Sequence, residues 1–190
     1  MIHFKTIRWK NFLSTGNQFT EVILDKTPTT LIVGENGSGK STILDALTFS
    51  LFGKPFRRVN KGQLVNSVNN GGTLTEVEFD VGSKRYMVKR GIKKNIFEIY
   101  VDGKRLNQDA KIADQQEYLE NTILKLNYKS FTQIVILGSA SFTPFMQLKA
   151  TDRRTIIEDL LDIQIFSVMN GLLRSRMSEN KESVLNNGVH

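Results

Sequence analysis

The stretch from Gly34 to Ser41 constrains this chain more than any other. It reads Gly-Glu-Asn-Gly-Ser-Gly-Lys-Ser, with Thr42 directly after it. Glycines let backbone N–H groups turn toward an anion, a lysine adds a compact positive charge, and a serine hydroxyl can bind Mg²⁺. Residues 34–42 are therefore predicted to form a phosphate-binding loop, with Lys40 as the candidate catalytic residue and Ser41 as the candidate metal ligand. The residues expected to bind nucleotide here are Asn36, Gly37, Ser38, Gly39, Lys40, Ser41 and Thr42.

The residues on either side of this loop fit the same interpretation. Residues 29–33 read Thr-Thr-Leu-Ile-Val and predict a short buried strand. Ser41 to Phe52 predicts a helix, with Leu44, Leu47, Thr48 and Leu51 on one face. The helix would end at Gly53, ahead of Pro55. A helix N-terminus adds partial positive charge to bound phosphates, so the order strand, loop, helix argues against a chance glycine-rich turn.

Composition narrows the remaining classes of protein. The chain has 190 residues, enough for one large domain or for one domain with an appendage. It has no cysteine, and its only histidines are His3 and His190, which argues against thiolate or histidine metal sites. No apolar run approaches the roughly 20 residues of a membrane helix. The N-terminus lacks a signal-peptide pattern, so we expect a cytoplasmic protein without a membrane partner.

The formal net charge of +7 favours an anionic partner such as nucleic acid, although an ordinary lysine-rich surface is an open alternative. Basic residues follow the first helix and recur between residues 84 and 94. Each group could contact DNA phosphates or simply face solvent. No base-reading motif accompanies them, so DNA contacts would be independent of sequence. The candidate DNA-contacting residues are Lys54, Arg57, Arg58, Lys84, Arg85, Lys89, Arg90, Lys93 and Lys94.

Alternating apolar residues predict several strands. Near the N-terminus the alternation changes phase between Phe4 and Ile7, which predicts a strand with a bulge. A second strand is expected from Phe19 to Leu24. Residues 73–106 predict an antiparallel β-meander, separate from the nucleotide-binding sheet.

Further along, we expect a helix from Asp109 to Leu126 and a β-rich apolar run from Phe131 to Leu137. Thr151 is expected to cap a helix that runs to about Leu161. A polar helix is expected over residues 164–187, and its apolar spacing thins after Met177, which is typical of a helix that begins a coiled coil. The expected inward residues are Ile112, Leu119, Ile123 and Leu126 in the first helix and Ile156, Ile157, Leu160 and Leu161 in the second. The expected division is a body over residues 1–163 and a helical segment over 164–190.

An expected part of a hydrolysing site is missing from the sequence. Such sites normally hold Mg²⁺ and orient water with an acidic residue at the end of an apolar strand. Residues 131–137 end in Gly138, and Glu158-Asp159 lies in a helical pattern. The chain therefore carries half of an ATPase site.

Taken together, three blocks resemble the N-terminal lobe of an SMC-like ABC ATPase head, of the SbcC family in double-strand-break repair. They are Lys10-Asn11-Phe12, the loop with residues 41–47, and Phe131-Thr132 leading to Lys149 and Arg153. Residues 52–57, 61–64 and 143–146 resemble the branch of T-even phages.

The resemblance implies an α/β P-loop NTPase fold that binds ATP and Mg²⁺. It also implies four partners: a C-terminal lobe, a second head joined through ATP, a nuclease subunit at the coiled-coil base, and double-stranded DNA. The chain ends where the coiled coil would begin, as expected for an excised lobe or half of a split head. ATP binding would then regulate the nuclease.

The resemblance also adds site residues outside the loop. Ser14 would lie near the nucleotide, and Asn66 and Ser67 would lie where relatives contact the base. Ser139 aligns with a glutamine that touches Mg²⁺ in the family. Two alternatives stay open at this point: a chromosome-organising SMC protein without a nuclease, and an ATPase of a membrane transporter.

Overall fold

The computed structural model describes residues 2–106, 111–137, 143–161 and 163–187. The chain forms two compact units, Met1–Phe142 and Thr143–His190. Among the described helices, none is both long enough and apolar enough to cross a bilayer.

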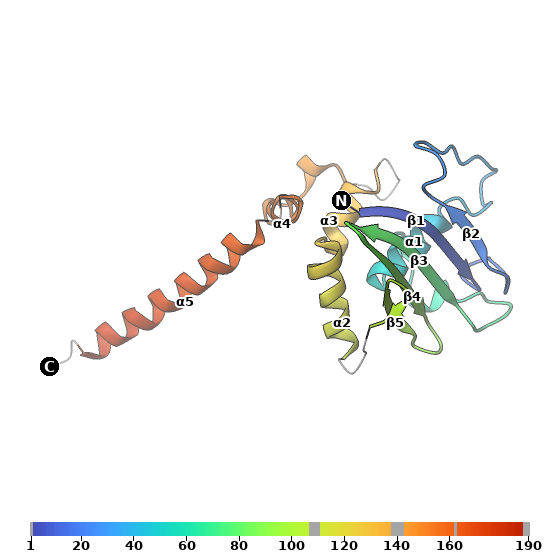
Figure 1. Ribbon diagram of the computed structural model, residues 1–190. Helices are drawn as coiled ribbons and strands as arrows, with labels where there is room; N and C mark the ends of the chain where they lie inside the picture. Colours follow the sequence, from blue (N-terminus) through green and yellow to red (C-terminus); the bar gives the residue numbers. More distant parts are fainter. Residues whose placement is uncertain (1, 107–110, 138–142, 162, 188–190) are drawn as a thin grey trace. The chain divides into compact units, whose positions relative to one another are not determined.

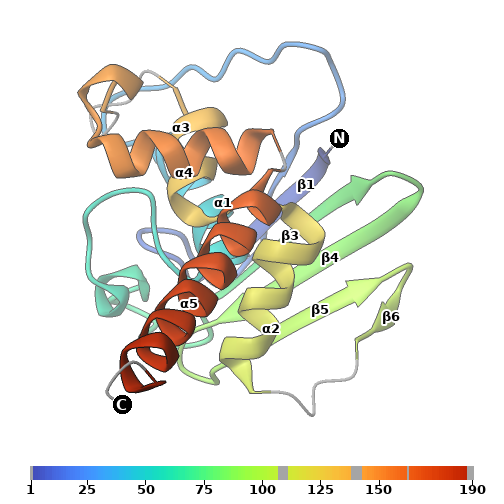
Figure 2. The same ribbon diagram turned by 90° about the vertical axis from the view of Figure 1, so that its left-hand side faces the viewer.

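A six-stranded antiparallel sheet forms the framework of the first unit (Figures 1 and 2). Its strand order is β2-β1-β3-β4-β5-β6. The strands are β1 (Ile2–Lys10), β2 (Thr20–Ile23), β3 (Leu74–Val81), β4 (Lys84–Gly91), β5 (Phe97–Val101) and β6 (Lys104–Arg105). The meander over residues 73–106 is confirmed, but the expectation that it stands apart is wrong. β3 pairs along the whole of β1, so the meander and the N-terminal strands share one sheet.

The bulge expected in β1 is confirmed. The register between β1 and β3 shifts between Phe4 and Thr6. Side chains alternate across a strand, so an extra residue at this point brings Phe4 and Ile7 to the same face. Phe4 then lies 5.7 Å from Phe79, ring centroid to ring centroid, and Ile7 is fully buried.

Helix α1 (Thr42–Phe52) packs against β1, β3 and β4 and closes the core on one face of the sheet. Nine of its residues are buried, so its buried surface is much wider than the one stripe expected. The helix ends as expected at Gly53. That residue has a left-handed φ of 68° and donates its N–H to the Phe49 carbonyl at 2.9 Å.

The expected helix over residues 109–126 is shorter and changes type. It comprises α2 (Ile112–Tyr118) and the π-helix η2 (Leu119–Leu124), and it ends at Lys125, whose φ is 53°. Leu119 and Ile123 are buried as expected, whereas Ile112 is exposed. Asp109 lies outside the described residues.

The β-rich run expected from Phe131 to Leu137 is wrong, because α3 (Tyr128–Ile134) occupies its first part. The side chain of Asn127 accepts a hydrogen bond from the Ser130 N–H at 3.0 Å, which satisfies a free donor at the helix start. Phe131 then enters the core, with its ring centroid 6.0 Å from that of Phe4 and 5.1 Å from that of Phe52. The apolar run is thus only partly inward, because Phe131 and Ile136 are buried whereas Val135 and Leu137 are 43% and 69% exposed.

The strand expected over residues 29–33 is also wrong. This segment has no assigned secondary structure and no strand pairing among the described residues. Leu31 and Val33 are 85% and 79% exposed. A strand is stable only when neighbouring backbone groups pair with it, and none of the described strands does so.

The second unit contains η3 (Phe145–Gln147), α4 (Ala150–Leu160) and α5 (Gln164–Asn187). Helix α4 begins before Thr151, so this threonine is not its cap, and Lys149 occupies the capping position. Ile156 is buried, but Ile157, Leu160 and Leu161 are exposed, contrary to expectation. Helix α5 confirms the expected C-terminal helix. Its exposed apolar residues are Ile165, Phe166, Val168, Met169, Leu172, Leu173, Met177 and Val184.

Candidate functional site

The glycine-rich loop adopts a conformation that its glycines permit. Gly37 and Gly39 have φ angles of 88° and 94°, in the left-handed region where a side chain is strained. A Cβ added at Gly34 would lie 2.6 Å from the Ser38 hydroxyl oxygen. Gly37 and Gly39 therefore depend on glycine for their backbone conformation, whereas a side chain at Gly34 would require only the Ser38 hydroxyl to move. The segment leads directly into α1.

Lys40 and Ser41 present their polar groups at the start of α1. The Lys40 ammonium donates to the Gly34 and Glu35 carbonyls at 2.6 and 2.7 Å, which keeps the side chain folded over its own loop. Ser41 occupies the N-cap position, yet its hydroxyl makes no capping hydrogen bond. That hydroxyl is therefore not committed to the helix and can serve as a ligand.

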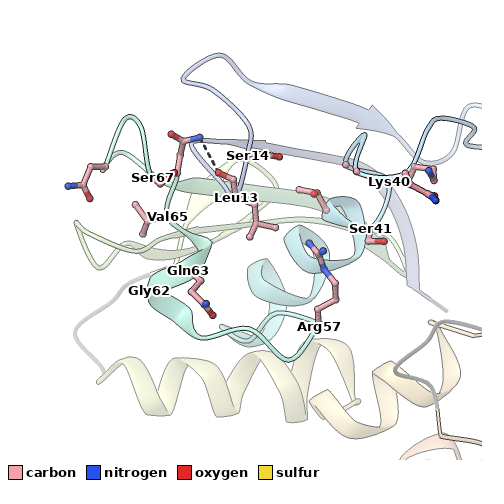
Figure 3. Close-up of a pocket in the computed structure, with 15 residues that line it drawn as sticks. Leu13, Ser14, Lys40, Ser41, Arg57, Gly62, Gln63, Val65 and Ser67 are labelled. Carbon is pink, nitrogen blue, oxygen red and sulfur yellow. Dashed lines mark hydrogen bonds between the residues drawn. The ribbon is translucent and has the colours of Figure 1, made fainter.

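A cavity of about 860 Å³ opens beside the loop, within the range of about 300–1,000 Å³ typical of small-molecule sites. Figure 3 shows Lys40 and Ser41 at one end and Val65 and Ser67 at the other. The lining residues are Leu13, Ser14, Asn36, Gly37, Gly39, Lys40, Ser41, Thr42, Arg57, Gly62, Gln63, Val65, Asn66, Ser67 and Asn70. Three segments distant in sequence thus meet at one pocket. It includes each nucleotide-binding residue expected from the sequence except Ser38, whose N–H donates to Glu35.

Asn66 fixes the shape of the pocket at the end opposite Lys40. Its side-chain amide donates to the Leu13 and Thr15 carbonyls at 3.0 and 3.1 Å. Its side-chain oxygen accepts from the N–H groups of Val68 and Asn69 at 3.0 and 2.9 Å. With only 6% of its surface exposed, Asn66 acts mainly by joining two loops. Sequence reasoning placed Asn66 near a base but missed this clamping role.

Arg57 lines the pocket and pairs with the buried carboxylate of Asp45, an ion pair that sequence reasoning also missed. Asp45, on α1, has no exposed surface and accepts from the Arg57 backbone N–H at 2.9 Å. Its other oxygen accepts from the Arg57 guanidinium at 2.6 Å. A fully buried carboxylate needs such partners, and the position of Asp45 on the inward side of the predicted helix was the available sign of a buried ion-pair partner.

Burial, together with the charge of Asp45, raises the pKa of Tyr128, whose hydroxyl donates to the Pro55 carbonyl.

A comparison with protein families matches residues 6–183 to the family described as "AAA domain". This chain belongs to that family. The match spans both compact units and includes the glycine-rich loop.

Relatives of this AAA-domain chain have names from DNA metabolism. It is 47% identical to exonuclease subunit 2 of Escherichia phage RB69 over 91% of the chain, and 48% identical to that of Enterobacteria phage T4 over 87%. It is 30% identical to the DNA double-strand break repair Rad50 ATPase of Thermoplasma acidophilum. That match covers 83% of this chain and 18% of the relative. The chain spans only 31% and 30% of the two phage relatives. The resemblance to the SbcC family and its phage branch is confirmed.

Solved structures confirm the expected fold class. The Smc head domain of Pyrococcus furiosus gives a TM-score of 0.65 at 18% identity, over 98% of this chain and 48% of that one. A chain from a study of ATP-driven dimerization of SMC ATPases gives a TM-score of 0.52 at 21% identity, over 83% of this chain and 99% of that one. The AAA-domain chain therefore has the fold of an SMC-type head lobe.

The residues of the pocket fit a nucleotide with Mg²⁺. The two left-handed glycines, the lysine and the uncommitted Ser41 hydroxyl converge at the N-terminus of an eleven-residue helix. Such a terminus favours phosphate because its free N–H groups and its dipole both attract anions. Ser139, the second expected metal ligand, lies outside the described residues.

The basic residues expected to contact DNA do not form one surface. Arg85 pairs with Asp80 at 3.5 Å and Lys89 pairs with Glu76 at 3.3 Å, so cross-strand carboxylates offset both charges. The sequence showed these cations, but their carboxylate partners depend on the register between β3 and β4, which was not predicted. Lys84, Lys93 and Lys94 are exposed at strand ends and turns, and Lys54 and Arg58 are exposed after α1. The ammonium of Lys54 also lies 5.8 Å from the Tyr128 ring centroid.

The prediction that Arg90 contacts DNA is wrong, because only 9% of its surface is exposed. Its guanidinium donates to the Ser50 and Leu51 carbonyls at the end of α1 and to Gln116 at 2.6 Å. It also stacks 3.8 Å from the Phe97 ring centroid. Burial lowers the pKa of Arg90 to about 10, so the group stays protonated at neutral pH. Arg90 is thus an internal tie between β4, α1 and α2.

Proposed function

We propose that this chain is the ATP-binding N-terminal lobe of an ATPase head that belongs to a DNA-repair nuclease complex. The observation that carries the proposal is the pocket in which the glycine-rich loop, residues 13–14 and residues 62–70 converge. Relatives named as exonuclease subunits and as part of the nuclease SbcCD support the nuclease context.

Each part of the pocket has a role in this proposal. Residues 36–42 form the phosphate cradle. Its N–H groups that do not already donate to Glu35 or Gly39, together with the ammonium of Lys40, bind the phosphates. Ser41 holds Mg²⁺, with Ser139 as a second ligand on the strength of the family resemblance alone. Ser14, Asn66 and Ser67 surround the base end. Bound Mg²⁺ would neutralise phosphate charge.

The remaining parts of the machine come from outside these residues. Head dimerisation through ATP, a C-terminal lobe with the missing acidic residue, and a nuclease at a coiled-coil base formed from residues 164–190 all belong to the proposal. The exposed apolar residues of α5 support a helix that packs against another one. Double-stranded DNA is the proposed ligand for exposed cations such as Lys84 and Lys94.

Nucleotide binding by a Lys40→Ala variant tests the central assignment. Removing a charged donor to phosphate should weaken ATP binding roughly 10- to 150-fold, as expected for one charge-assisted hydrogen bond or more. Isothermal titration with Mg-ATP measures the affinity. Lys104→Ala, an exposed lysine on β6, is the matched control and should bind like the wild type. Equal ATP affinity of the Lys40 and Lys104 variants would remove the site assignment.

A chromosome-organising SMC protein is the second candidate, and the similarity to Smc head structures favours it. The two candidates differ in whether a nuclease binds. Co-purification of the full-length protein with its candidate nuclease partner separates them, because an SMC protein of the second type would leave the nuclease unbound.

A further inference from the structure

Phe19 is an exposed aromatic residue flanked by two cations. It precedes the edge strand β2 and exposes 41% of its surface. The Arg8 guanidinium carbon lies 5.0 Å from its ring centroid and the Lys10 ammonium lies 5.1 Å away. Both cations project from β1 on the opposite side from the buried Ile7 and Trp9. An exposed phenylalanine alone needs no explanation, but a ring beside cations is how proteins stack bases next to phosphates.

A small cavity continues this surface toward the turn between β4 and β5. It has a volume of about 140 Å³, the space of four to five liquid waters by the usual volume of roughly 30 Å³ each. Its lining residues are Lys10, Gly72, Thr73, Leu74, Lys93, Lys94 and Ile96. Lys10 both contacts Phe19 and lines the cavity, so the ring and the cavity are neighbours. The space suits a phosphate group rather than a whole nucleoside.

The charges at this cavity differ from those on the rest of the sheet. Arg8 and Lys89 share the buried carboxylate of Glu76, at 2.5 and 3.3 Å. In contrast, Lys10, Lys93 and Lys94 form no ion pair with any residue in the described part of the chain. The Lys93 ammonium donates to the backbone and side-chain oxygens of Asn70, which are neutral acceptors. Positive charge is therefore uncompensated where the cavity opens.

We propose that Phe19, Lys10, Lys93 and Lys94 form a binding site for single-stranded nucleic acid. The lysines hold phosphates and Phe19 stacks on an unpaired base, which a duplex does not offer because its bases stack on one another. The proposal adds a contact to the DNA binding proposed above. It rests on that proposed function, because the function is the reason for choosing nucleic acid as the polyanion. An acidic protein segment could neutralise the lysines but would give Phe19 no base to stack on.

Fluorescence anisotropy with labelled oligothymidylate, and with a duplex of the same length, tests the site on the 190-residue chain. Phe19→Leu should weaken oligothymidylate binding about fivefold or more and leave the salt dependence unchanged. Combined Lys10→Gln, Lys93→Gln and Lys94→Gln should weaken it and reduce the slope of log K against log salt by about 2, at about 0.7 for each phosphate contact. The matched control neutralises three exposed lysines elsewhere, Lys26, Lys61 and Lys104, and should keep the wild-type slope.

Three outcomes would overturn the proposal. They are wild-type oligothymidylate binding by Phe19→Leu, an equal loss of duplex binding in that variant, and competition by poly-glutamate as strong as that by unlabelled oligothymidylate. The last would identify an acidic protein segment as the ligand. Mg-ATP affinity measured on the same samples reports on the nucleotide pocket separately. It should stay at the wild-type value in Phe19→Leu and fall in Lys40→Ala, so failure of this site and failure of the proposed function are distinguishable.

Discussion

Asn66 shapes one wall of the pocket beside the glycine-rich loop although only 6% of its surface is exposed. Its amide joins the loop at residues 13–15 to the loop at residues 66–69 through four hydrogen bonds. Asn11 reinforces the same junction, because its carbonyl accepts from the Asn66 N–H and from the Thr73 hydroxyl. If residues 65–67 contact the base, the position of that contact depends on Asn66 rather than on the phosphate loop.

Asn66→Ala should therefore separate base binding from phosphate binding. Two carbonyls and two N–H groups lose their partner, and the loops should move apart. We expect ATP affinity to fall by about 1–2 kcal/mol, roughly 5- to 30-fold, with tripolyphosphate affinity unchanged. Calorimetric titration with both ligands measures this, with the exposed Asn121→Ala as the control. A parallel loss for both ligands would mean that Asn66 supports the whole fold of the pocket.

Arg90 illustrates a limit of reading charge from sequence. It belongs to a basic stretch of β4, yet strand alternation places it with Val88 on the core face, opposite Lys89. Its guanidinium replaces lost hydration with bonds to α1 carbonyls and to Gln116. Alternation alone could have identified Arg90 as inward. Its partners could not be foreseen, because α1 and α2 meet it only in the folded chain.

At the scale of elements, cross-strand ion pairs cover the face of the sheet opposite α1. Glu76 on β3 pairs with Arg8 on β1 and with Lys89 on β4. Asp80 likewise pairs with Lys5 and Arg85, each at 3.5 Å. Paired cations attract phosphate less than free ones, because each carboxylate already offsets their charge. DNA contacts in this unit should therefore concentrate at strand ends and turns.

Two double variants with the same loss of charge test this distribution. Arg85→Gln with Lys89→Gln should change the salt slope of duplex DNA binding only slightly. Lys84→Gln with Lys94→Gln should reduce that slope by up to about 2, at about 0.9 for each lost phosphate contact. Filter binding over a range of salt concentrations measures both slopes. The reverse ranking would show that the ion pairs open when DNA binds.

Local patterns predicted some elements and failed for others for identifiable reasons. The loop, α1 and its Gly53 end were predictable, because the glycines, Lys40 and the helical spacing all act within one short segment. The bulge in β1 was predictable from its change of phase. Residues 29–33 and α3 were not. A short apolar run fits a strand or a buried helix equally well, and only distant partners decide between them. Asn127 was the available sign of a helix start.

At the scale of the whole molecule, the pocket beside the glycine-rich loop has Lys40 and Ser41 but no acidic side chain among its described lining residues. Among the described residues, no cluster of three or more acidic, histidine or cysteine side chains could hold a metal ion. The exposed residues 31–33 and the apolar residues of α5 are further surfaces that suit additional protein. We expect all three features in a lobe that another segment completes.

Hydrolysis by this chain alone and in a mixture tests that interpretation. The purified chain should bind Mg-ATP but show no steady-state hydrolysis, because no acidic side chain lines the described pocket to orient the attacking water. Adding the C-terminal lobe of the same head should bring activity, and duplex DNA should raise it. A Lys40→Ala chain in the same mixture is the control and should abolish the gain. Phosphate release is measured in all four samples: the lone chain, the mixture, the mixture with DNA, and the mixture with the Lys40→Ala chain. Turnover by the lone chain at the rate of the mixture would require the acidic residue to lie within these 190 residues.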